Sequence, residues 1–180
     1  MYLWFGIDLN EQLTEVREQI AIAESIVPPT HSALTLPLHI SLKISFYAPA
    51  HLVEPIKKRV LAYFETLTPF LIETAGVQRE GNIVWLRYQP HATLTSIQKT
   101  LGAFLLEEFG VPQHPYDLDF KFHTTLYLDD DSERVDKAEE TLLHIPYPPR
   151  VLANRFCIGV SDDGSLGTYS VVETVYHDAL

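Results

Sequence analysis

The sequence predicts an α+β protein built from two similar halves, and the order of the expected elements leads to this prediction. The order helix, strand, helix, hairpin can be read twice along the 180 residues. Hydrophobic residues make up 46% of the chain, which is enough to bury a substantial core. The single cysteine, Cys157, sits in an apolar run with no partner for an intramolecular disulfide, so we expect it to be a buried thiol.

The first half contains an initial strand and then one copy of this order. Apolar residues recur at three- and four-residue steps where a helix is expected, and they alternate with polar residues where a strand is expected. Asn10 is a candidate N-cap, and Pro28-Pro29 ends the first helix. The expected elements are a strand at 2–8, a helix at 10–27, a strand at 36–47, a helix at 52–64 and a hairpin of strands at 70–78 and 83–88.

The second half repeats the order with little sequence identity. Its expected elements are a helix at 94–109, a strand at 118–128, a helix at 132–142 capped by Ser132, and a hairpin of strands at 151–160 and 169–176. An ordinary α+β arrangement with accidental symmetry is the alternative. If a pseudo-twofold relates the halves, equivalent strands face each other across their interface, which is a usual place for a ligand site.

Charge and composition limit the partners of the protein. The formal net charge is -11 with 13 Lys and Arg residues, so an extended nucleic-acid surface is not expected. A small nucleotide or an RNA terminus remains compatible, because it needs only a local site. No signal peptide, membrane span or obligatory protein partner is evident in the sequence. Without a disulfide framework, a reducing, cytoplasmic location is expected.

Two of the expected strands carry a histidine followed two residues later by a hydroxyl residue. They contain His39-Ile40-Ser41 and His123-Thr124-Thr125. Side chains alternate along a strand, so the first and third residues of each triplet share a face. The polar faces of the two strands are expected to present His39, Ser41, Lys43, His123, Thr125 and Tyr127 to a cleft.

Two imidazoles on opposite sides of a phosphodiester can catalyse an in-line displacement. The ordinary histidine pKa of about 6.5 allows one ring to take a proton from water while the other gives a proton to the leaving sugar oxygen. Neighbouring hydroxyls can donate to the non-bridging oxygens, where charge must be stabilised. This chemistry requires no metal ion and no cofactor.

The spacing alone is not specific, because a third triplet, His91-Ala92-Thr93, also occurs. The expected structural position of each triplet distinguishes the first two from the third. His39 and His123 lie in the middle of strands at equivalent places in the two halves, 123 − 39 = 84 positions apart. His91 follows Pro90 and leads into a helical run, so we expect it to act locally near a helix start.

The segments LHISLKISF and FHTTLYL resemble the paired motifs of the two-histidine (2H) phosphoesterase superfamily, which includes bacterial 2′-5′ RNA ligase-like proteins and cyclic nucleotide phosphodiesterases. The resemblance spans nearly the whole chain. It implies a single domain at 1–180, a bilobal duplicated fold with two antiparallel sheets, flanking helices and a central cleft. The lobe-forming halves are expected at about 10–89 and 92–178, with strand 2–8 added. The implied activity is hydrolysis or ligation at a 2′,3′-cyclic or 2′-5′-linked phosphate of a nucleotide or RNA end.

Residue roles follow from the same resemblance. His39 and His123 are expected to be the acid–base pair, and Ser41 and Thr125 the phosphate ligands. Separately from the resemblance, strand alternation places Lys43 and Tyr127 two residues beyond these hydroxyls on the same face, where they are expected either to contact substrate or to be plain solvated strand residues. Ser41 departs from the commoner Thr and lacks the methyl group that restrains the threonine rotamer.

Two other functions remain open. The first is a nucleotide or RNA-end binding module without turnover. The second is a metal site using both histidines, for which Asp119 is the nearest acidic candidate. Trp4 and Phe5 are expected either to wall the cleft or to pack in the core, and Asp129-Asp130-Asp131 is expected to lead into a helix.

Overall fold

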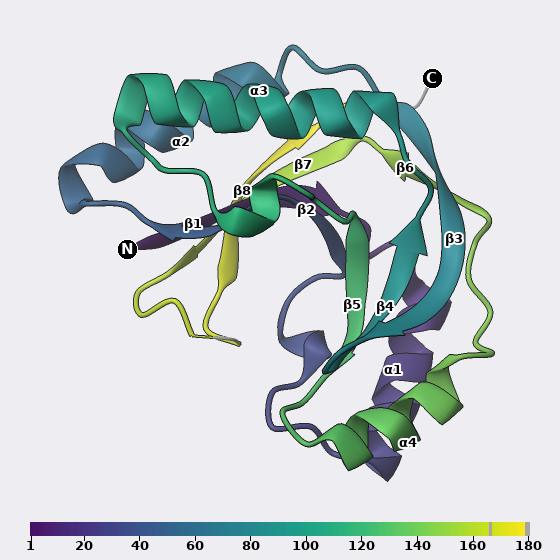
Figure 1. Cartoon of the computed structure of the whole chain (residues 1–180). Helices are drawn as coiled ribbons and strands as arrows, with labels where there is room; N and C mark the ends of the chain where they lie inside the picture. The colour runs from purple at the N-terminus through teal and green to yellow at the C-terminus, as the bar shows by residue number, and fades with distance from the viewer. Residues whose placement is uncertain (166, 179–180) are drawn as a thin grey trace.

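The computed structural model, which describes residues 1–165 and 167–178, contains two four-stranded sheets of antiparallel strand pairs (Figure 1). The strand orders are β2-β1-β7-β8 and β5-β4-β3-β6. The α+β prediction with two antiparallel sheets is therefore confirmed. The strands are β1 Tyr2–Asp8, β2 His39–Tyr47, β3 Phe70–Glu80, β4 Ile83–Tyr88, β5 His123–Leu128, β6 Arg150–Ala153, β7 Arg155–Ser161 and β8 Ser170–Tyr176.

In the described part of the chain, four α-helices flank the sheets, two on each. Helices α2 (Ala50–Phe64) and α3 (Ala92–Phe109) accompany the first sheet, whereas α1 (Thr14–Ile26) and α4 (Ser132–Leu142) accompany the second (Figure 1). Each sheet with its two helices forms a lobe. Among the described residues, no helix combines the length and apolar character needed to cross a membrane.

The lobes do not coincide with the halves of the sequence. The first sheet combines β1 and β2 with β7 and β8 from the end of the chain, and the second combines β3 and β4 with β5 and β6. The prediction of lobe-forming halves at 10–89 and 92–178 is wrong in this respect. Hydrophobic alternation specifies which face of a strand is buried, but the backbone N–H and C=O groups at its edges can pair with any other strand.

Other differences from the predicted elements are local. The predicted strand 118–128 begins only at His123, because residues 115–117 form a 3₁₀ turn and 118–122 stay irregular. The predicted strand 151–160 is interrupted at Asn154, and its two parts, β6 and β7, belong to different sheets. Asp131, not Ser132, caps α4, and its side chain accepts from the N–H of Glu133.

The predicted helix stripes form the core. They supply Val16, Ile20 and Ala23 from α1 and Leu94, Ile97, Leu101 and Leu105 from α3, all buried in one continuous apolar cluster that joins the two lobes. Cys157 is fully buried as expected, and burial raises the pKa of its thiol. Because the core is shared, the two sheets are held at a fixed relative position.

The edge strands β2 and β5, which carry the two histidine motifs, meet where the sheets adjoin. The Thr124 hydroxyl donates to the backbone carbonyl of His39 at 2.9 Å. A hydroxyl has one hydrogen, so the Tyr88 hydroxyl, 2.8 Å away, is the donor to Thr124. Thr124 is 1% exposed, so this chain of two hydrogen bonds is buried between the sheets.

Replacing Thr124 by Val, which has nearly the same shape, should lower the free energy of unfolding by about 1–3 kcal/mol. The substitution leaves a buried carbonyl and a buried phenol without their partner. Urea unfolding measures the loss. Thr125→Val is the matched control on the same strand, because the Thr125 hydroxyl bonds to no other group in the described part of the chain. Equal losses in the two variants would contradict the role of this contact.

Candidate active site

The two motif strands have the same burial pattern over their first five residues. In β2 and in β5 the order is half-buried, buried, half-buried, buried, buried. The half-buried positions are His39 and Ser41 in β2, and His123 and Thr125 in β5. The sequence prediction placed these four side chains on the polar face of each strand, and the structure confirms that placement.

A β-bulge interrupts each strand directly after its motif. In β2, Ser41 pairs with Gly6 and Lys43 pairs with Phe5, so Leu42 is the extra residue. In β5, Thr125 pairs with Trp85 and Tyr127 with Val84, so Leu126 is the extra residue. An extra residue shifts the two-residue alternation by one position. The residue four places after each histidine therefore turns into the interior.

The prediction that Lys43 and Tyr127 face the substrate is wrong for this reason. Lys43 is 2% exposed, and its ammonium group forms a buried ion pair with the Asp117 carboxylate. The same carboxylate oxygen accepts from the backbone N–H of His114 at 2.7 Å. Tyr127 is fully buried in the core. Lys43 thus anchors the segment that leads into β5 and does not meet a ligand in the cleft.

The His39 and His123 rings are oriented in the same way. Nδ1 of His39 lies 2.8 Å from the carbonyl oxygen of Pro37, and Nδ1 of His123 lies 2.6 Å from that of Lys121. A carbonyl can only accept, so Nδ1 carries the hydrogen in both rings. In the neutral form each Nε2 then has a free lone pair. Each ring is therefore prepared to act as a base through Nε2.

A tryptophan from the neighbouring strand packs against each histidine. Trp4 of β1 meets the His39 ring edge-to-face with the centroids 4.3 Å apart. Trp85 of β4 stacks on His123 at 4.0 Å with an angle of 11° between the planes. These contacts restrict both imidazoles, which matters because proton transfer requires a fixed geometry. Trp4 takes the cleft-wall position considered from sequence, whereas Phe5 lies in the core.

Burial keeps both imidazoles neutral near pH 7. The pKa of His39 is lowered from 6.5 to about 4, mainly by loss of hydration and to a smaller extent by the charge that His123 can carry. Loss of hydration also lowers the pKa of His123. The two imidazoles lie on strands that contact each other at the β2–β5 junction. Both rings are thus poised to accept a proton when a negative charge arrives.

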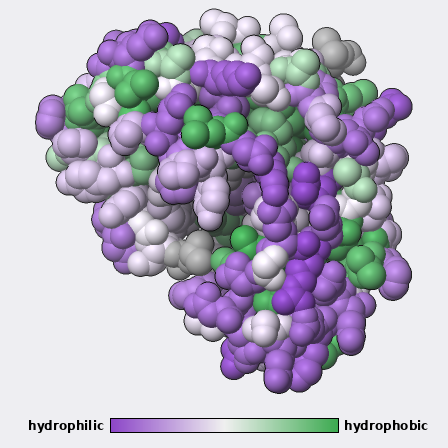
Figure 2. All heavy atoms as spheres, viewed as in Figure 1, coloured by the Kyte–Doolittle hydropathy of each residue, from purple (hydrophilic) through white to green (hydrophobic). Residues whose placement is uncertain are grey.

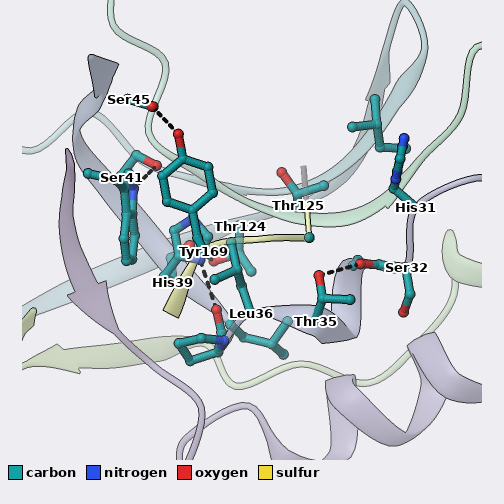
Figure 3. Close-up of a pocket in the computed structure, with 16 residues that line it drawn as sticks. His31, Ser32, Thr35, Leu36, His39, Ser41, Ser45, Thr124, Thr125 and Tyr169 are labelled. Carbon is teal, nitrogen blue, oxygen red and sulfur yellow. Dashed lines mark hydrogen bonds between the residues drawn. The ribbon is translucent and has the colours of Figure 1, made fainter. Parts of the chain in front are cut away.

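A pocket of about 200 Å³ opens beside the first motif, on the face hollowed between the lobes in Figure 2. His39, Ser41, Thr124 and Thr125 contribute to its wall, and Figure 3 shows them from both strands. His123 lies beside this group on β5 but outside the pocket lining. Most of the remaining wall is apolar and comes from the segment 31–38.

Sequence reasoning missed several residues of this site. Tyr169, just before β8, lines the pocket, and its hydroxyl is hydrogen-bonded to Ser45 of β2 (Figure 3). His31 and Trp85 were likewise not selected. No periodicity marks these residues, because they reach the site through strand pairing and loop packing. Trp85 had one usable signal, since it is one of only 2 tryptophans in the chain.

Other candidates have local roles. His91 is the N-cap of α3, as expected for a residue near a helix start. The Asp129 carboxylate accepts from the N–H groups of Thr30 and Asp131, and Asp131 caps α4. The helix lead-in interpretation of this acidic run is confirmed. Across residues 1–165 and 167–178, no three His, Cys, Asp or Glu side chains are grouped closely enough to hold a metal ion.

Comparisons with known proteins identify the family and the fold. A family model described as the 2′-5′ RNA ligase superfamily matches residues 3–165. The fold is similar to that of E. coli LigT, crystallised with 3′-AMP, with a TM-score of 0.62 and 20% identity over 97% of this chain and 96% of that one. It is also similar to TT0787 of Thermus thermophilus, with a TM-score of 0.62 and 20% identity over 98% and 97% of the two chains.

A more distant structural match is Usb1 of Kluyveromyces marxianus, with a TM-score of 0.50 and 15% identity over 98% of each chain. A search of curated proteins finds no match to the sequence. At these identities the solved structures show the shared fold, and the family model identifies the family.

Replacing Lys43 by Met should lower the free energy of unfolding by about 3 kcal/mol or more, because a buried carboxylate loses its cation. The combined change Lys43→Met and Asp117→Asn should cost less than the sum of the two single changes, since it removes both charges. Chemical denaturation provides the values. Lys58→Met, at an exposed position of α2, is the control and should shift stability by no more than about 0.5 kcal/mol.

The protein should lose stability as the pH falls from about 6.5 to about 4. In this window unfolded His39 binds a proton that the folded protein does not accept, so protonation favours unfolding. One such histidine contributes a slope of at most about 1.4 kcal/mol per pH unit. His39→Gln should flatten the measured dependence, and exposed His144→Gln should leave it unchanged. A steeper slope in His39→Gln would contradict the lowered pKa.

Proposed function

The chain belongs to the 2′-5′ RNA ligase superfamily, and from this premise we propose that it is a metal-independent phosphodiesterase. Its proposed substrate is a 2′,3′-cyclic or 2′-5′-linked phosphate of a nucleotide or RNA end. The observation that carries the proposal is the matched pair of imidazoles on adjoining strands, each with Nδ1 bonded to a carbonyl and with no partner for Nε2 among the described residues. General acid–base catalysis at a diester requires two such groups.

The lowered pKa values fit this use of the histidines. A neutral ring is the form that takes a proton from water, and burial maintains that form in the free protein. The second ring must be protonated to give its proton to the leaving oxygen. A bound phosphodiester is an anion, and its charge raises the pKa of nearby imidazoles. Substrate binding therefore supplies the protonated partner, and the near-symmetry makes the two roles exchangeable.

The hydroxyls and the pocket support a substrate of low charge. Ser41 and Thr125 lie two residues after the histidines and can donate to the non-bridging oxygens. Among the described residues lining the pocket there is no Lys or Arg. A diester carries a single negative charge, so it needs less compensation than a polyphosphate. Related E. coli LigT has been crystallised with 3′-AMP, NADP⁺, ATP and phosphate, which supports a small nucleotide as the ligand of this chain.

The test is hydrolysis of a 2′,3′-cyclic nucleotide monophosphate in excess EDTA. The native protein should produce a nucleotide monoester, and His39→Ala and His123→Ala should each reduce kcat by roughly 10²-fold or more. The rate of the native protein should follow a bell-shaped pH profile, because one ring must be neutral and the other protonated. Exposed His144→Ala is the control and should keep the native rate.

Three outcomes would each contradict a part of this proposal. Full activity in either motif variant would exclude the paired mechanism. Saturable binding of the cyclic nucleotide without any product over hours would support the alternative, a nucleotide-binding module without turnover. Activity that vanishes in EDTA and returns with a divalent cation would, in addition, exclude the metal-independent reaction.

A further inference from the structure

We propose that Trp4 is a positioning residue that fixes the Ser41 hydroxyl for its contact with the substrate phosphate; this inference rests on the proposed function. Ser41 stands where the second motif has Thr125 and lacks the methyl group that restrains a threonine side chain. The structure supplies another restraint. The indole Nε1 of Trp4 donates to Ser41 Oγ at 3.0 Å.

The direction of this hydrogen bond determines what Ser41 can do. An indole N–H is only a donor, so Ser41 Oγ must be the acceptor. The single hydroxyl hydrogen of Ser41 then points elsewhere, and no described residue accepts it. Ser41 lines the pocket, so the free hydrogen is available to a ligand oxygen there (Figure 3). A developing negative charge on phosphate is the acceptor such a donor stabilises best.

Trp4 is itself rigidly held, as a positioning residue must be. It is 5% exposed, and its ring lies over two glycines on neighbouring positions of the sheet. A Cβ atom on Gly6 would come within 2.4 Å of the ring, and one on Gly159 within 2.5 Å. The absence of side chains at these two positions lets the indole lie close to the sheet. From there it reaches both Ser41 and the His39 ring.

The second motif lacks the hydrogen bond between the tryptophan indole and the hydroxyl residue within the described part of the chain. Trp85 stacks on His123, but its indole N–H has no partner in the described part of the chain. The Thr125 hydroxyl accepts no indole hydrogen bond, although Trp85 and Thr125 are paired across the strands. Thr125 has its own methyl group as a restraint. Among the described residues, the hydrogen bond from an indole N–H to the motif hydroxyl therefore occurs in the motif that carries serine and not in the motif that carries threonine.

The first test uses NMR and does not depend on turnover. The chain has 2 tryptophans, so a ¹⁵N-labelled sample gives two indole N–H signals, which Trp4→Phe and Trp85→Phe assign. Ser41→Ala should shift the Trp4 signal and accelerate its exchange with water at least several-fold. The Trp85 signal should stay in place. An unchanged Trp4 signal would overturn the inference, whatever the enzymatic activity proves to be.

The second test is a double-mutant cycle on hydrolysis of the cyclic nucleotide. Trp4→Phe keeps a ring against His39 but removes the N–H, and should lower kcat/KM about tenfold, equivalent to about 1.4 kcal/mol. In a Ser41→Ala background, the same change at Trp4 should alter kcat/KM by less than twofold, because there is no hydroxyl left to orient. In a Ser41→Thr background, its effect should also be well below tenfold, because the methyl group restrains the side chain.

The cycle separates positioning from a structural role. Thermal unfolding should show that Trp4→Phe is folded, and its pH–rate profile should keep the native shape, because His39 remains packed against an aromatic ring. A tenfold loss that persists in the Ser41→Ala background, or a displaced pH profile, would overturn the inference in favour of an effect through His39. A native protein without any turnover would defeat the proposed function but leave the NMR test of the Trp4–Ser41 contact intact.

Discussion

The hydrogen bond from the Thr124 hydroxyl to the His39 carbonyl is the contact on which the geometry of the site depends. It joins the central residue of one histidine motif to the backbone of the other, across the line where two separate sheets meet. Edge strands normally leave unpaired backbone groups that need protection. Here, part of the β2 edge is satisfied by a side chain from β5, so the sheets are kept close without merging. The buried Tyr88 hydroxyl completes the interaction by donating to Thr124.

The bulges after the motifs give this junction two surfaces with different chemistry. Before each bulge, a histidine and a hydroxyl residue face the cleft. After it, Lys43 in one strand and Tyr127 in the other turn into the interior. In the interior, Lys43 forms an ion pair with Asp117, which lies in the segment that leads into β5. The strand that presents His39 therefore also stabilises the segment that precedes His123. The same two short strands therefore supply both the residues that face the cleft and the residues that stabilise the interior.

The two lobes are similar in design but not equivalent at the site. Each histidine bonds through Nδ1 to a different backbone carbonyl and packs against its own tryptophan, and burial lowers the pKa of both. The hydroxyl residues differ: Ser41 accepts a hydrogen bond from its neighbouring indole, whereas the Trp85 indole beside Thr125 has no partner among the residues that the structure describes. The pocket is also one-sided, because segment 31–38 and Tyr169 enclose the first motif. Such asymmetry allows a duplicated fold to bind a substrate that has no symmetry of its own.

The sequence by itself determined the types of the elements, the buried faces of the helices and the two strands that carry histidine and hydroxyl at alternating positions. These properties are periodic and local, so they can be read from residue spacing. Only the tertiary structure decided that the sheets exchange strands between the halves, that Lys43 and Tyr127 are buried, and that Trp4, Trp85 and Tyr169 join the site. Strand partners and bulges depend on which backbone groups meet in space, and a linear pattern does not encode that choice.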